Sequence, residues 1–167
     1  NAVKGGASIA DLEDQVASKK KILLTAPLAE HPKIKHEIAA GLKDMEEHGD
    51  SHANDAKSQL DLAKSFLNID EPPRALKRAD LAVNLAPQDP QARIVRAESY
   101  AKMHRYEEAA EDARLALKLD PSNREALAVL QLTAGRTSGE AGRTPATQTA
   151  AAMPGMGQAG AQPTAAR

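Results

Sequence analysis

The chain repeats itself with a period of 34 residues. When residues 56–89 are laid over residues 90–123, small, aromatic, leucine and proline positions coincide. The matched pairs are Ala63 with Ala97, Phe66 with Tyr100, Ala75 with Ala109, Ala79 with Ala113, Ala82 with Ala116, Leu85 with Leu119 and Pro87 with Pro121. A fixed period of this length indicates a repeat array, in which each unit buries its apolar face against its neighbours.

The repeated positions are mostly alanine, and aromatic residues make up only 2% of the chain. Alanine is the strongest helix former, and its small side chain lets two helices cross closely. A larger side chain at such a crossing overpacks it, at a cost of about 1–3 kcal/mol. The period therefore predicts closely packed helix pairs, with the aromatic residue filling the space between them.

Helical periodicity covers most of the chain, and no segment shows the alternation of a strand. The second helix is expected to stop at Gly49 and Asp50. We expect helices over residues 8–25, 32–47, 51–67, 73–85, 90–102, 106–119 and 122–134. The predicted fold class is all-α, a short α-solenoid of antiparallel helix pairs.

Helix–turn–helix units of this period resemble the tetratricopeptide repeat. The family pattern has a small residue at the eighth position, an aromatic at the eleventh, alanine at the twentieth and twenty-seventh, and proline at the thirty-second. These positions hold Ala63, Phe66, Ala75, Ala82 and Pro87 in the first unit, and Ala97, Tyr100, Ala109, Ala116 and Pro121 in the second. The fourth and seventh positions depart from the usual large apolar residues, since the second unit has Arg93 and Arg96 there and the first has Gln59 at the fourth.

The resemblance covers residues 56–134, and its third unit continues for one helix only. We therefore expect four segments in the chain. Residues 1–7 are a disordered N-terminus, and residues 8–50 are a helical pair that is either a degenerate repeat or a cap. Residues 51–135 hold the repeats with a C-terminal capping helix, and residues 136–167 are a disordered tail rich in Ala, Pro, Gly and Gln.

Several classes of chemistry are not expected. Lys and Arg number 22 against 23 Asp and Glu, so no basic surface points to nucleic acid, and no apolar run is long enough to span a membrane. There is no Cys, no phosphate-binding loop and no other enzyme motif, so we predict no catalysis and no cofactor.

Clusters of polar residues are interpreted as solvated surface. His48 and His52 are expected to be loop histidines rather than metal ligands, because Gly49 and Asp50 lie between them. Lys19, Lys20 and Lys21 are expected on a solvated face. The acidic cluster of Glu107, Glu108, Glu111 and Asp112 is expected on an exposed helix face, in ion pairs within the helix.

The resemblance implies a concave groove, lined by the first helix of each repeat, that takes a peptide or helix of a partner. Six positions are expected to face it: Lys57, Leu60, Lys64, Gln91, Ile94 and Glu98. On this hypothesis Ile94→Glu weakens partner binding without unfolding the domain; the alternative is that these residues are merely solvated or covered by the N-terminal pair. The family's carboxylate clamp for chaperone C-termini needs Lys and Asn where this chain has Leu60 and Lys64, so that partner is not expected.

The predicted function is non-catalytic binding of a protein or peptide partner in this groove. Two alternatives stay open from the sequence. The repeats form a homo-oligomeric scaffold or a spacer in a larger assembly, or they are the regulatory domain of an enzyme whose catalytic part lies outside this chain.

Overall fold

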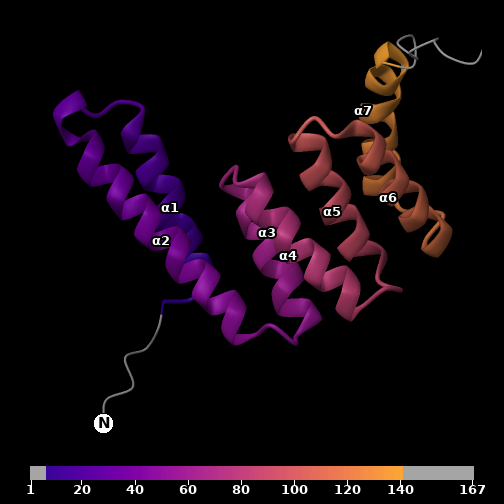
Figure 1. Cartoon of the computed structure of the whole chain (residues 1–167), viewed down its shortest axis with the longest axis horizontal. Coiled ribbons are helices and arrows are strands. Elements are labelled where there is room, and N and C mark those ends of the chain that lie inside the picture. Colours follow the sequence, from indigo (N-terminus) through magenta and orange to yellow (C-terminus); the bar gives the residue numbers. More distant parts are fainter. Residues whose placement is uncertain (1–6, 141–167) are drawn as a thin grey trace, which may run out of the picture.

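The computed structural model describes residues 7–140, which form seven α-helices and no strand. Figure 1 shows antiparallel pairs set side by side in chain order. The helices are α1 (Ile9–Leu23), α2 (His31–Ser51), α3 (Ala56–Asn68), α4 (Pro72–Leu85), α5 (Pro90–Lys102), α6 (Tyr106–Leu119) and α7 (Arg124–Glu140), with a 3₁₀ turn η1 (Leu28–Glu30) before α2. Each helix contacts the next, and α1, α3, α5 and α7 also contact one another in that order. The predicted all-α solenoid is confirmed.

The alanines that define the repeat form the helix crossings. All are closed to solvent, with 0% of their surface exposed: Ala63, Ala75, Ala79, Ala82, Ala97, Ala109, Ala113 and Ala116. Phe66 is also fully buried, and the half-buried Tyr100 carries the Arg105 guanidinium 4.5 Å from its ring centroid. The small residues therefore set the spacing of the helices, as the sequence predicts.

The odd-numbered helices of the repeats begin at polar side chains that recur at the same period. The Asp55 carboxylate accepts the backbone N–H of Lys57 at 3.2 Å, and the Asp89 carboxylate accepts that of Gln91 at 2.9 Å. Asn123 plays the same part at the start of α7, where its side-chain oxygen accepts a backbone N–H at 3.1 Å. Such caps satisfy donors that have no partner within the helix. Helix α7 thus starts in register as the first helix of a third unit.

The turns inside the two repeats also share one geometry. Asp70 (φ 58°) and His104 (φ 62°) lie one period apart, between α3 and α4 and between α5 and α6. This left-handed backbone reverses the chain over a few residues, although side chains other than glycine rarely adopt it. The equivalent position of the third unit is Ser138, where α7 remains helical.

Helix α7 consequently runs past the expected start of the tail at residue 136, and residues 136–140 belong to it. Its last turns are tied to α6 by Arg136, whose Nη1 donates to the Tyr106 hydroxyl at 3.0 Å. The same guanidinium lies 5.0 Å from the Tyr106 ring centroid. The remaining parts of the predicted termini, residues 1–6 and 141–167, lie outside the described residues.

The sequence predicts that helix α2 stops at Gly49 and Asp50. In the structure it continues to Ser51. Two carbonyls in its last turns accept hydrogen bonds from side chains of α3 and α4. The Gly49 carbonyl accepts from Gln59 Nε2 at 2.7 Å, and the Glu46 carbonyl accepts from Arg78 Nη2 at 2.9 Å. Gly49 is buried, and a Cβ atom added there would clash with Leu62 and lie 2.8 Å from Arg78 Cζ. The glycine serves a close approach between helices, not a helix end.

The N-terminal pair is joined to the repeats through polar contacts as well as through the core. The Arg78 side chain is only 1% exposed and pairs with Asp50 at 2.8 Å. Lys20 Nζ donates to the Ile69 carbonyl at 2.8 Å at the end of α3 and also pairs with Glu71. Lys20 is therefore a structural contact rather than part of a solvated lysine face. None of the helices in the described residues has the length and apolar character needed to cross a bilayer.

Candidate functional site

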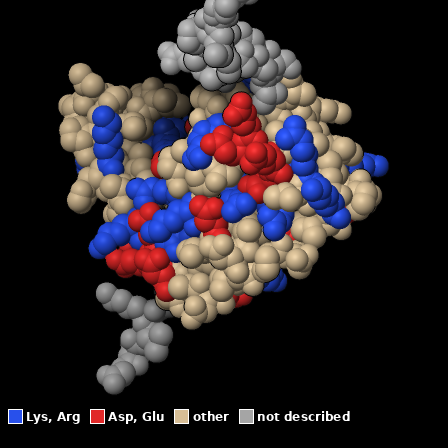
Figure 2. Space-filling view, turned by 45° about the vertical axis from the view of Figure 1, so that its right-hand side comes forward, with Lys and Arg blue, Asp and Glu red and all other residues tan. Residues whose placement is uncertain are grey.

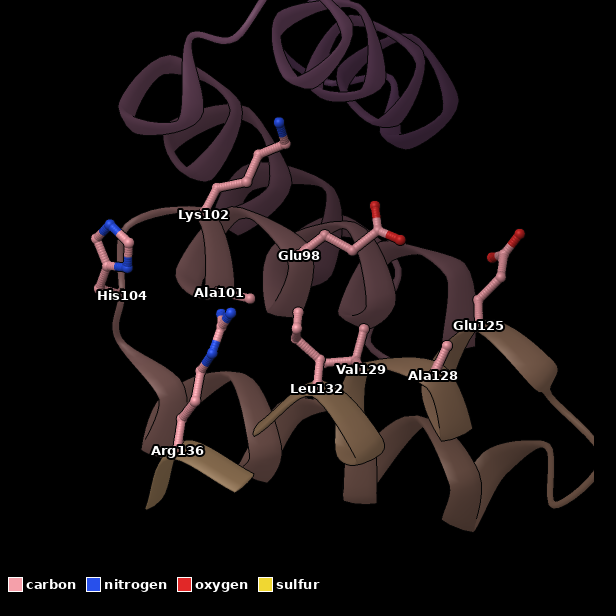
Figure 3. Close-up of a pocket in the computed structure, with 9 residues that line it drawn as sticks. All are labelled: Glu98, Ala101, Lys102, His104, Glu125, Ala128, Val129, Leu132 and Arg136. Atoms are coloured by element: carbon pink, nitrogen blue, oxygen red, sulfur yellow. The ribbon is translucent and has the colours of Figure 1, made fainter. Parts of the chain in front are cut away.

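A cleft with a volume of about 610 Å³ lies between α5 and α7, on the side of the molecule where the odd-numbered helices meet (Figure 3). Both helices are the first helices of their units. The lining residues are Glu98, Ala101, Lys102 and His104 from α5 and its turn, and Glu125, Ala128, Val129, Leu132 and Arg136 from α7.

The middle of the cleft is apolar. Ala101 and Val129 are buried beneath it, whereas Leu132 leaves 46% of its surface exposed. Ala128 and Leu132 are four residues apart in α7, so they lie on one side of that helix and face the cleft together. Figure 3 shows Val129 and Leu132 pointing from α7 into the space beside Ala101. A leucine this exposed in a concave site offers apolar area to another molecule.

The two ends of the cleft differ in charge. In Figure 3, His104, Lys102 and Arg136 lie towards one end, and Glu98 and Glu125 lie towards the other. Lys102 pairs with Asp70 at 3.2 Å, and His104 Nδ1 lies 2.7 Å from the Tyr106 hydroxyl, to which Arg136 also donates. This difference in charge arises because α5 and α7 both have basic side chains near their C-terminal ends, Lys102 and Arg136.

The two carboxylates at the acidic end make no direct ion pair in the described residues. Neither Glu98 nor Glu125 makes an ion pair with any residue of the described range 7–140. Burial raises the pKa of the half-buried Glu98, and the neighbouring Glu125 raises it further, although Lys64 and Lys102 act in the opposite direction. Gln91 Nε2 donates to Glu125 Oε2 at 3.0 Å. The site therefore holds negative charge that its own side chains leave partly unbalanced.

The six residues predicted to face a groove are divided by the structure. Lys57 and Lys64 are exposed on α3, Gln91 is half-buried on α5, and Glu98 lines the cleft. Leu60 and Ile94, only 8% and 1% exposed, are core residues instead. The expectation that Ile94→Glu leaves the fold intact is wrong, because α7 lies against α5 and Ile94 packs with Ala116 and Ala126.

The sequence missed most of the cleft. Most of its apolar lining belongs to α7, which the resemblance treats only as a cap. The signal that could have found it is the row of apolar residues at Ala128, Val129 and Leu132, which follow the repeat pattern past its second full unit.

The other polar clusters serve the fold. The expectation that Asp112 lies on an exposed face is wrong. It is buried in α6, where its carboxylate accepts two hydrogen bonds of 2.6 Å from Arg96 of α5. Arg96 also reaches Asp80 of α4 at 3.1 Å, and these acids hold its pKa above the ordinary value. Glu108 does pair locally, with Arg105 at 2.7 Å. Arginine at the seventh position thus replaces an apolar contact with an ion pair that joins three helices.

The histidines form no metal site with other ligands. The His48 and His52 rings stack with centroids 4.5 Å apart, and burial together with His52 lowers the pKa of His48. Within residues 7–140 no group of three or more His, Cys, Asp or Glu side chains is arranged to hold a metal ion. On the face drawn in Figure 2, acidic and basic side chains are interspersed rather than gathered into one basic field.

Comparison with known families bears on the repeats themselves. The family model described as "Tetratricopeptide repeat" matches residues 90–123, the span of α5, α6 and the link that follows. Residues 90–123 form a tetratricopeptide repeat. The resemblance inferred from the alanine, aromatic and proline positions is confirmed. A search of curated proteins found no match to the sequence.

Solved structures of tetratricopeptide domains share the fold. The first such domain of Spaghetti (RPAP3), bound to the HSP90 peptide SRMEEVD, is 16% identical with a TM-score of 0.54, over 80% of this chain and 98% of that one. The second domain of human RPAP3, in complex with the HSP70 peptide SGPTIEEVD, is 20% identical with a TM-score of 0.52, over 74% and 98%. The Sgt2 domain from Aspergillus fumigatus is 14% identical with a TM-score of 0.53, over 91% and 97%. The similarity to these tetratricopeptide domains extends well beyond the matched repeat.

Proposed function

We propose that this chain is a non-catalytic protein-interaction module that binds a segment of a partner in the cleft between α5 and α7. The observation that carries the proposal is the exposed Leu132 above a buried apolar floor, flanked by charged side chains at both ends. An apolar centre with a polar rim is the usual anatomy of a protein-binding surface. Two proteins of the same fold are solved with peptides of HSP90 and HSP70, which supports peptide binding by this architecture.

The proposed partner is defined by the cleft and not by those peptides. Leu60, at a position the family uses in its carboxylate clamp, is buried in the core of this chain. The exposed lysines Lys57 and Lys64 and the half-buried Gln91 extend the same surface towards α3, and we include them with Glu98 in the proposed site.

A peptide-display selection on the full chain tests this function, because a random library does not require the partner to be identified first. Enriched peptides are expected to lose binding to Leu132→Asp and to keep it for Leu127→Asp. Leu127 is a matched control, since it lies on the same helix, is 44% exposed against 46% for Leu132, and does not line the cleft.

Three results decide between the possibilities. Enrichment that depends on Leu132 alone supports the cleft. Enrichment that is equal for both variants places binding elsewhere and rejects this site. No enrichment, together with concentration-dependent size in light scattering, favours a self-associating scaffold instead.

A further inference from the structure

We propose that the segment seated in this cleft is a helix with an apolar stripe and opposite charges at its two ends. A basic side chain of the partner lies against Glu98 and Glu125, and an acidic side chain lies against Arg136 and Lys102. This inference rests on the proposed function and adds the conformation and the charge order of the partner.

The apolar floor favours a helix over an extended peptide. Ala101, Ala128, Val129 and Leu132 offer no side-chain hydrogen-bonding group in the middle of the cleft. The backbone groups of α5 and α7 are engaged within their own helices. An extended segment would therefore bury its N–H and C=O groups without partners, whereas a helix satisfies its own.

The acidic end favours a cation. Glu98 is half-buried beside Glu125, and the two carboxylates have no ion pair within residues 7–140. Burial and then the neighbouring Glu125 raise the pKa of Glu98, and Lys64 and Lys102 offset this only in part. A Lys or Arg of the partner would relieve this repulsion, whereas an acidic residue there would add to it.

The basic end favours an anion. The only ion-pair partner of Lys102 in the described residues is Asp70, which is 80% exposed, and exposed pairs of this kind are weak. Arg136 uses Nη1 on the Tyr106 hydroxyl, which leaves further N–H groups of its guanidinium for a carboxylate. Figure 3 shows the Arg136 side chain directed towards the space beside Ala101.

The length of the cleft sets the spacing of the two charges. From Glu125 to Arg136, helix α7 rises on the order of 16 Å, or about three turns. Glu98 and Lys102 on α5 are only four residues, or about one turn, apart. A partner helix lying along α7 would therefore carry its two end charges between about one and three turns apart, on the same side as its apolar stripe.

The charge order is tested with peptides selected on the full chain and with the variant Glu125→Lys. The matched control is Glu107→Lys, which reverses an exposed acid of α6 outside the cleft. We expect the selected peptides to become helical on binding and to carry the predicted charge order. Glu125→Lys should weaken them about ten-fold while Glu107→Lys leaves affinity unchanged. Reversing the basic residue of the peptide to Glu should restore binding to Glu125→Lys.

Other outcomes overturn the inference in distinguishable ways. Peptides that depend on Leu132 but stay extended, show no charge order or ignore Glu125→Lys reject the helix and its polarity and leave the proposed function standing. Failure to select any peptide that depends on Leu132 rejects both. Circular dichroism of each variant confirms that the fold is retained before affinities are compared.

Discussion

Gly49 and Gly135 both lie inside helices, but their surroundings are opposite. A side chain at residue 49 would meet Leu62 and Arg78, whereas one at residue 135 would meet nothing within 4 Å. Glycine is therefore required by the packing at residue 49, whereas at residue 135 it only lowers the helix propensity. Local sequence rules treat the two alike, because the difference lies in α3 and α4.

Gly49→Ala should lower the free energy of unfolding, since overpacking of about 1–3 kcal/mol exceeds the helix-propensity gain of roughly 1 kcal/mol. Gly135→Ala should raise it by about 0.5–1 kcal/mol. Thermal melts followed by circular dichroism check both. Equal melting temperatures for the two variants would contradict the close approach at Gly49.

Glu98 gives the molecule a pH dependence of known sign. Its pKa is raised in the folded chain by burial and by Glu125, against the effect of Lys64 and Lys102. A raised carboxyl pKa means that its favourable contribution is full below the unfolded pKa and is lost as the pH rises through the folded pKa. Glu98→Gln should therefore be more stable than the original chain at pH 7, and the difference should shrink below about pH 4. Urea titrations at several pH values measure the gap, and a constant gap would argue against the shift.

At the scale of elements, the contacts between α4, α5 and α6 combine small residues with the ion pairs that Arg96 forms with Asp112 and Asp80. The alanine crossings follow from the period, and they could be predicted from the sequence because both copies carry them. The pairing of Arg96 with Asp112 could not, since the arginine breaks the family pattern and the acid lies in another helix. The burial of Leu60 and Ile94 could not be predicted either, because periodicity does not say which neighbour covers a helix face.

Asp112→Ala should destabilise the chain by about 3–5 kcal/mol, because it leaves Arg96 largely buried with only the half-exposed Asp80. Replacing both partners with leucine should recover most of that loss, since an apolar pair restores the pattern usual at the seventh position. Chemical denaturation of Arg96→Leu, Asp112→Leu and the double leucine variant gives the coupling free energy between positions 96 and 112. A double variant no more stable than Asp112→Ala would show that leucine does not fit between α5 and α6.

At the scale of the molecule, the N-terminal pair and the first repeat share one core. A continuous cluster of buried residues runs from Leu12 and Val16 in α1 to Ala92 and Val95 in α5. Arg78 and Gln59 add a buried polar connection between α2, α3 and α4. The sequence predicted the pair and its helices, but it left open whether the pair is a cap or a repeat, because neither Arg78 nor Gln59 belongs to a recognisable pattern.

Removing the Arg78 side chain should loosen this connection. Arg78→Ala leaves the Glu46 carbonyl without its guanidinium donor and opens a cavity beside Gly49, so we expect a loss of about 3–5 kcal/mol and a broader denaturant transition. Arg114→Ala, at an exposed site on α6, should stay within about 0.5 kcal/mol. If Arg78→Ala keeps a single sharp transition at the original midpoint, the apolar core alone joins the two parts.

The left-handed residues Asp70 and His104 also decide how far an array of this kind extends. A further unit requires the chain to reverse one period after His104, and α7 instead continues straight through that point to Glu140. Lengthening the array therefore requires a new bend and not merely more residues after α7. Replacing residues 137–140 with the turn residues 103–106, one period earlier, would create an acceptor for additional units. A helix appended directly after Glu140 would instead start beyond the edge that a second helix must cover.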